Sequence, residues 1–144
     1  MTINEKILTE IHGVLPSKEK MEAAEFYGIT YLDDGLTFKK LAQHPDIYSM
    51  IDNLQQDRIM NISNYDYYAV ITTGWAAPLD ENGEVKNRPS VDPQRRRVRL
   101  IITVDVNDKD IASVIEFSDD PDNLLFDHDN ATGPLKDAIR NLLL

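Results

Sequence analysis

Hydrophobic and polar residues alternate along residues 97–105. If this segment is extended, one side of it carries Val98, Leu100, Ile102 and Val104. The opposite side carries Arg97, Arg99, Ile101, Thr103 and Asp105. Because successive side chains of a strand point to opposite faces, this two-residue period predicts a β-strand. It is the strongest strand pattern in the sequence.

Further strands are predicted on both sides of this segment. Residues 67–73 are rich in aromatic and β-branched residues, and residues 111–118 alternate in polarity. Residues 106–110, of which 107–110 are polar, predict a turn. Residues 97–105 and 111–118 are therefore expected to form an antiparallel hairpin.

The predicted sheet occupies residues 66–127, with a short last strand at 124–126 and an irregular loop at 79–96. This loop is polar, contains one glycine and two prolines, and shows neither a helical nor a strand period. Long loops of this kind inside a domain are often functional or disordered. The loop is therefore a candidate binding element.

Residues 1–60 are predicted to be mainly helical. Apolar residues recur at helical spacing from about residue 3 to residue 15, and shorter helices are predicted at 18–27 and 37–42. A further helix begins at Asp46, whose carboxylate suits a helix N-terminus. Its apolar side consists of Ile47, Met50, Ile51 and Leu54.

A short strand is predicted at 29–32 and an amphipathic C-terminal helix at 134–143. Helices followed by strands and a last helix indicate the α+β class. We expect a single domain over residues 1–144, with an antiparallel three- to four-stranded meander covered by N-terminal helices and a C-terminal helix.

Composition narrows the possible functions. The 144 residues carry a formal net charge of −10, which disfavours broad binding to nucleic acids or anionic membranes. The chain has no cysteine, so it forms no disulfide and has no thiolate nucleophile or cysteine metal ligand. No apolar run is long enough to span a membrane, and no secretion signal is evident. We expect a soluble, cytoplasmic protein.

The strongest binding signal is a cluster of basic residues. Residues 86–99 hold six of the 15 Lys and Arg residues, and the cluster includes Arg88 and an arginine arm: Arg95, Arg96, Arg97 and Arg99. Arginine forks suit carboxylates and phosphates, and Trp75 would offer a stacking surface if it lies beside the arm. A simpler interpretation pairs the arginines with residues 105–129, which hold nine acids and one lysine.

Trp75 itself has two interpretations. It leaves the predicted strand after Gly74, where it could line a pocket. We favour the alternative, in which Trp75 covers the core at a sheet edge.

An acidic segment near the end of the chain is a weaker candidate for a metal site. Its oxygen and imidazole ligands are Asp119, Asp122, Asp127, His128 and Asp129. The segment lacks the glycine and the ligand spacing of a calcium loop, so a solvated loop is the favoured interpretation.

Catalytic patterns are poor. Of the three histidines, His12 lies near the end of a predicted helix and His44 precedes a proline, where helix-terminal roles are common. No nucleophile elbow or zinc-protease motif is found. We therefore favour a protein without enzymatic activity and without a cofactor.

These observations lead to one favoured hypothesis and two alternatives. The favoured hypothesis is a small binding or regulatory protein that contacts another protein through residues 79–99. The first alternative is a nucleotide or nucleic-acid binder that uses the arginine arm and Trp75. The second is a carboxylate-metal hydrolase that uses the acidic segment 119–129.

Overall fold

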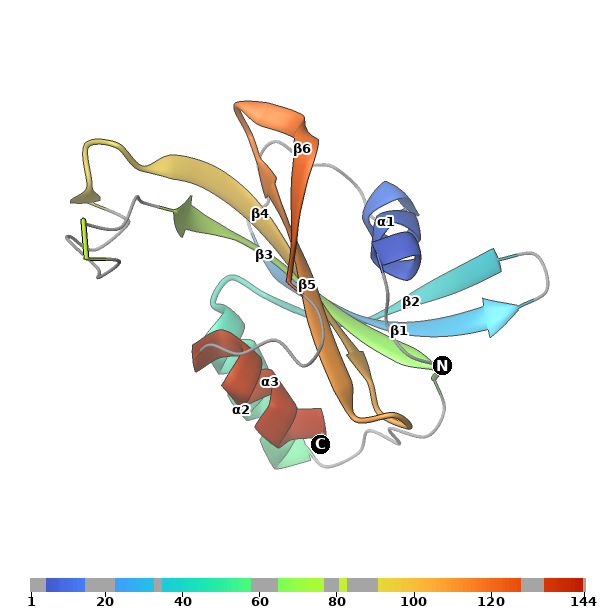
Figure 1. Ribbon diagram of the computed structural model, residues 1–144. Helices are drawn as coiled ribbons and strands as arrows, with labels where there is room; N and C mark the ends of the chain where they lie inside the picture. The colour runs from blue at the N-terminus through green and yellow to red at the C-terminus, as the bar shows by residue number, and fades with distance from the viewer. Residues whose placement is uncertain are drawn as a thin grey trace.

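A computed structural model describes residues 5–14, 23–32, 35–57, 65–76, 81–82, 91–127 and 134–143. In these residues the chain forms a six-stranded antiparallel sheet and three helices (Figure 1). The helices are α1 (Glu5–Val14), α2 (Ile47–Asp57) and α3 (Pro134–Leu143). The strands are β1 (Ala24–Leu32), β2 (Gly35–His44), β3 (Tyr67–Ala76), β4 (Arg96–Asp105), β5 (Asp110–Phe117) and β6 (Asp120–Asp127). The predicted α+β class is confirmed, but the sheet has more strands than predicted.

The strands lie in the order β2-β1-β3-β4-β5-β6. Strands β3 to β6 form the predicted meander, in which each strand pairs with the next along the chain. The β1–β2 hairpin extends this meander, because β1 pairs with β3. The strand with the strongest sequence pattern, β4, therefore lies between β3 and β5 in the interior of the sheet.

Helices cover both faces of the sheet, with α1 on one face and α2 and α3 on the other (Figure 1). The first face buries Ile7, Leu8 and Ile11 of α1 against residues that include Tyr67 and Ile101. The second face buries Met50, Ile51, Ile139 and Leu143 of α2 and α3 against residues that include Phe26, Tyr68, Ile102 and Val104. Burial of both faces provides the main stabilisation of the sheet.

A local sequence signal explains where α2 begins. The Asp46 carboxylate accepts hydrogen bonds from the backbone N–H groups of Tyr48 at 2.8 Å and Ser49 at 3.4 Å. These groups belong to the first turn of a helix, where N–H groups lack partners within the helix. Asp46 is therefore the N-cap of α2, one residue before the helix that the sequence predicted to begin at Asp46.

Two of the helices predicted in residues 1–60 are wrong. The predicted helix 37–42 lies in β2, and residues 24–27 of the predicted helix 18–27 lie in β1. Residues 18–22 lie outside the described residues. The predicted short strand 29–32 is the second half of β1.

A β-bulge accounts for the error in β2. Phe26 pairs with Ala42 while the next residue, Tyr27, pairs with Lys40, so Leu41 is an extra residue in β2. The extra residue interrupts the two-residue alternation. It leaves Phe38, Leu41 and Ala42 at spacings of three and four residues, which is the spacing of a helix face.

None of the described helices has the length and apolar character needed to cross a membrane.

Candidate functional site

The alternation of β4 separates the arginines of the arm. Arg97 and Arg99 lie on the same face as Ile101, which packs under α1. Arg96 lies on the opposite face, over the ring of Phe117. Arg95 precedes the strand and lies over Trp75. The arginine arm is thus divided between the two faces of the sheet.

Trp75 lies at one end of the sheet, beside the guanidinium groups of Arg95 and Arg97. It pairs directly with Arg97 across β3 and β4. The guanidinium carbons of Arg95 and Arg97 lie 4.9 and 5.1 Å from the centroid of the indole ring, within the range of a cation–π interaction. The residue remains 40% exposed. Trp75 is therefore a surface residue, which corrects the prediction that it covers the core.

Neutral groups hold both guanidinium groups in place. The Arg97 Nη2 group donates a hydrogen bond to the Thr73 Oγ1 atom at 2.8 Å. The Arg95 Nη1 group donates to the carbonyl oxygen of Asp92 at 3.3 Å. We call the group formed by Thr73, Trp75, Arg95 and Arg97 the Trp–Arg surface.

A turn at Asp92 positions Arg95. The buried Asp92 carboxylate accepts a hydrogen bond from the Gln94 N–H at 2.8 Å, and the Asp92 carbonyl accepts one from the Arg95 N–H at 3.1 Å. A carboxylate that binds the backbone two residues later is typical of an Asx turn. The end of the predicted loop is thus folded tightly against the start of β4.

Arg99 belongs to a buried polar network. Its side chain is only 4% exposed, and its Nε atom lies 3.2 Å from the Glu116 Oε2 atom on β5. The other carboxylate oxygen of Glu116 lies 3.0 Å from the Nε2 atom of His12 on α1. This network joins α1 to β4 and β5, so Arg99 has a structural role.

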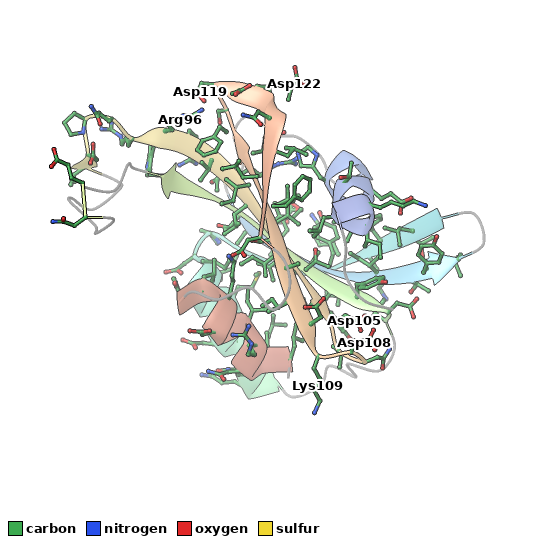
Figure 2. All side chains as sticks on the ribbon, viewed as in Figure 1. Arg96, Asp105, Asp108, Lys109, Asp119 and Asp122 are labelled. Atoms are coloured by element: carbon green, nitrogen blue, oxygen red, sulfur yellow. The ribbon has the colours of Figure 1, made fainter. Side chains whose placement is uncertain are left out.

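Arg96 forms an ion pair on the opposite face. Its guanidinium donates to both carboxylate oxygens of Asp119, with the Nη2 to Oδ1 distance at 2.6 Å (Figure 2). This hydrogen bonding lowers the pKa of the Asp119 carboxyl and raises the pKa of Arg96. The interpretation that pairs the arginines with residues 105–129 therefore holds for Arg96 and Arg99. Arg95 and Arg97 have neutral partners instead.

The structure separates two of the candidate metal ligands, Asp119 and Asp127. Asp119 immediately precedes the eight-residue strand β6, and Asp127 is the last residue of this strand. Asp119 pairs with Arg96, and Asp127 pairs with Lys136 of α3 at 2.7 Å. His128 and Asp129 lie outside the described residues. Among the described residues no group of three His, Asp or Glu side chains is arranged to hold a metal ion.

A second group of acids lies at the other end of the sheet, at the β4–β5 turn. Figure 2 shows Asp105 and Asp108 there beside Lys109, far from Asp119 and Asp122. The Asp105 carboxylate accepts hydrogen bonds from the N–H groups of Asn107 and Asp108 at 3.0 and 3.1 Å. It is buried, so its role is to fix the turn. Burial, followed by the negative charge of Asp105, raises the pKa of Tyr67 to about 12.

Of the predicted binding residues, the structure brings together Trp75, Arg95 and Arg97. Arg88 lies outside the described residues. Sequence reasoning missed Thr73, because a threonine inside a strand pattern gives no signal for binding. It also missed the contact of His12 with Glu116, which are 104 residues apart in the chain.

Comparisons with protein family models, with curated proteins and with solved structures gave no significant match.

Proposed function

We propose that this protein is a non-enzymatic binding or regulatory protein that contacts another protein through the Trp–Arg surface. The observation that carries this proposal is an indole ring that remains 40% exposed while two guanidinium groups lie over it. Tryptophan is highly buried on average, and aromatic residues are enriched at protein interfaces relative to the rest of the surface.

The residue types match those that dominate protein interfaces. Tryptophan and arginine are enriched among the few interface residues that supply most of the binding energy. Both arginine side chains are already held by hydrogen bonds, to Thr73 and to the Asp92 carbonyl. Less side-chain entropy is therefore lost when a partner binds, which supports affinity.

Charge favours a protein over a nucleic acid as the partner. The net charge of −10 repels a polyanion, and two arginines neutralise only about two phosphates. A protein partner requires only a small complementary patch. The long-range field of this protein therefore repels a nucleic acid more strongly than it repels a partner protein.

Affinity capture from extracts of the source organism tests the proposal. We expect a protein captured by the wild type and lost with Trp75→Ala, but retained with Tyr48→Ala. Tyr48 is a suitable control because it is also exposed, at 51%, but lies on α2 on the other face of the sheet. With the purified partner, Trp75→Ala should weaken binding by at least tenfold, as expected of a central interface residue. Capture that is unchanged by Trp75→Ala, with both variants folded, would refute the proposal.

The nucleic-acid alternative is tested separately with labelled single- and double-stranded DNA and RNA. It requires binding that falls steeply with added salt and that is lost when Arg95 and Arg97 are replaced by alanine. We expect no such binding.

A further inference from the structure

The Trp–Arg surface contains positive charge that the described residues do not neutralise. Arg95 and Arg97 are each shown with uncharged partners: a carbonyl oxygen, a hydroxyl group and the Trp75 ring. Arg96 and Arg99 differ, because both are paired with carboxylates of the same chain. In a protein of net charge −10, two such guanidinium groups form a local site for an anion.

The hydrogen bonds leave donors available on both guanidinium groups. A guanidinium group has five N–H donors, and one neutral acceptor is shown for each of these two arginines. The remaining N–H groups match the geometry of a carboxylate, which accepts two parallel hydrogen bonds. The Thr73 hydroxyl accepts from Arg97, so its own proton remains able to donate to a ligand.

The spacing of the two charges limits the ligand. The guanidinium carbons are no more than about 10 Å apart, because they lie 4.9 and 5.1 Å from the same ring centroid. In an extended peptide, side chains at positions i and i+2 point the same way and lie about 7 Å apart. The spacing of two acidic residues at alternate positions therefore falls within this limit.

We infer that the Trp–Arg surface binds an extended acidic segment of a partner protein, with carboxylates at alternate positions on Arg95 and Arg97. This inference rests on the proposed function and names the chemistry of the partner. The guanidinium groups already over the ring of Trp75 leave less of it for a nucleobase to stack on. A second copy of this chain is also disfavoured, because two molecules of charge −10 repel each other.

The test uses the fluorescence of Trp75, the only tryptophan of the chain. The probe is the peptide acetyl-Gly-Glu-Gly-Glu-Gly-amide, titrated at low salt into the full-length protein. Two peptides serve as controls, one with glutamine in place of glutamate and one with the two glutamates adjacent. We expect a saturable emission change with a Kd below about 1 mM for the alternating peptide only. Added salt should weaken peptide binding, because the arginines and the peptide carboxylates are partly exposed to solvent.

Three arginine variants connect the signal to the site. Arg95→Gln and Arg97→Gln should each weaken peptide binding by about tenfold, since each removes a charged hydrogen-bond donor. Arg96→Gln should change it less than twofold, because Arg96 faces the opposite side of β4. Arg95 is exposed and lies outside the strand, so Arg95→Gln tests the inference even if Arg97→Gln impairs folding.

The outcomes separate this inference from the proposed function. The inference fails if the alternating peptide gives no saturable change, or if the glutamine peptide gives the same one. It also fails if an eight-nucleotide single-stranded DNA binds more tightly with the same dependence on Arg95 and Arg97. Partner capture that still requires Trp75 would then leave the proposed function standing with a different ligand chemistry.

Discussion

The fluorescence of Trp75 reports the charge around a single residue. The protein as a whole should attract caesium and repel iodide, because its net charge is −10. Arg95 and Arg97 should reverse this preference at the ring, since both lie within about 5 Å of it. We predict that the ratio of iodide quenching to caesium quenching is higher for Trp75 than for free N-acetyltryptophanamide. Stern–Volmer titrations at constant ionic strength measure this ratio.

The arginine variants provide the control for this quenching ratio. Arg97→Gln should reduce the ratio, whereas Arg96→Gln should leave it nearly unchanged because Arg96 is paired with Asp119 on the other face. A wild-type ratio at or below that of N-acetyltryptophanamide would show that the local field at Trp75 is not positive.

Gly28 allows an aromatic ring to lie directly on the sheet. A Cβ atom at this position would lie 2.6 Å from the Cδ1 atom of Tyr65, closer than van der Waals contact permits. Tyr65 in turn packs edge-on against the buried Tyr68. We predict that Gly28→Ala lowers the free energy of unfolding by about 1–3 kcal/mol, as overpacking typically does. Urea denaturation measures the effect.

Gly74 is the matched control for Gly28, because both are strand glycines and a Cβ atom at Gly74 meets no atom within 4 Å. Gly74→Ala should therefore change stability by less than about 0.5 kcal/mol. In the Tyr65→Ala background, Gly28→Ala should lose most of its effect. An equal loss in both backgrounds would mean that the Tyr65 ring is not the cause.

Part of the Trp–Arg surface was predictable from single residues. Trp75 and the arginines stood out by residue type, and both were placed at strand ends. The pairing of Trp75 with Arg97 depends on the register of β3 and β4. This register could not be predicted, because a long loop without a periodic pattern connects the two strands. The faces of Arg96 and Arg97 followed from alternation, but their partners, Asp119 and Thr73, come from other strands.

At the scale of elements, the N-cap of α2 depends on one side chain. Asp46 accepts hydrogen bonds from two N–H groups of the first turn. We predict that Asp46→Ala lowers the free energy of unfolding by about 1 kcal/mol, whereas Asp46→Asn retains most of the stability. Thermal and urea unfolding measure both variants.

Asp52 is the control for this prediction, because it is an exposed acid of the same helix and lies beyond the first turn. Asp52→Ala should be close to neutral. If Asp46→Ala and Asp52→Ala lowered the free energy of unfolding by similar amounts, the effect would come from the loss of a negative charge and not from the loss of the N-cap.

The elements differed in how far the sequence could predict them. Alternation identified β4 and β5, because their registers run without interruption between residues 98 and 117. In β1, six consecutive residues are buried, since β1 lies inside the sheet with both faces covered, and no alternation was visible. In β2, the bulge at Leu41 produced a helical spacing. Long-range pairing therefore determines β2 and the first half of β1, which local sequence signals assigned to helices.

At the scale of the whole molecule, acidic residues outnumber basic ones by 25 to 15. The folded state concentrates this charge, so self-repulsion should destabilise it at low ionic strength. The exposed ion pairs of the structure, such as Arg96 with Asp119, are too solvated to outweigh it. We predict that raising NaCl from about 10 to about 300 mM increases the Tm by a few degrees, because salt screens the repulsion.

Peptide binding to the Trp–Arg surface should show the opposite response, because salt screens the attraction between the arginines and the carboxylates. Replacement of the exposed Asp120 and Asp122 by lysine changes the net charge from −10 to −6 and should reduce the gain in Tm with salt. Calorimetry at pH 7 measures each Tm. A Tm that falls as NaCl is added would mean that specific ion pairs, rather than net charge, control stability. If added NaCl raised both the Tm and the peptide affinity, apolar contacts would control both processes, because salting-out strengthens the burial of apolar surface.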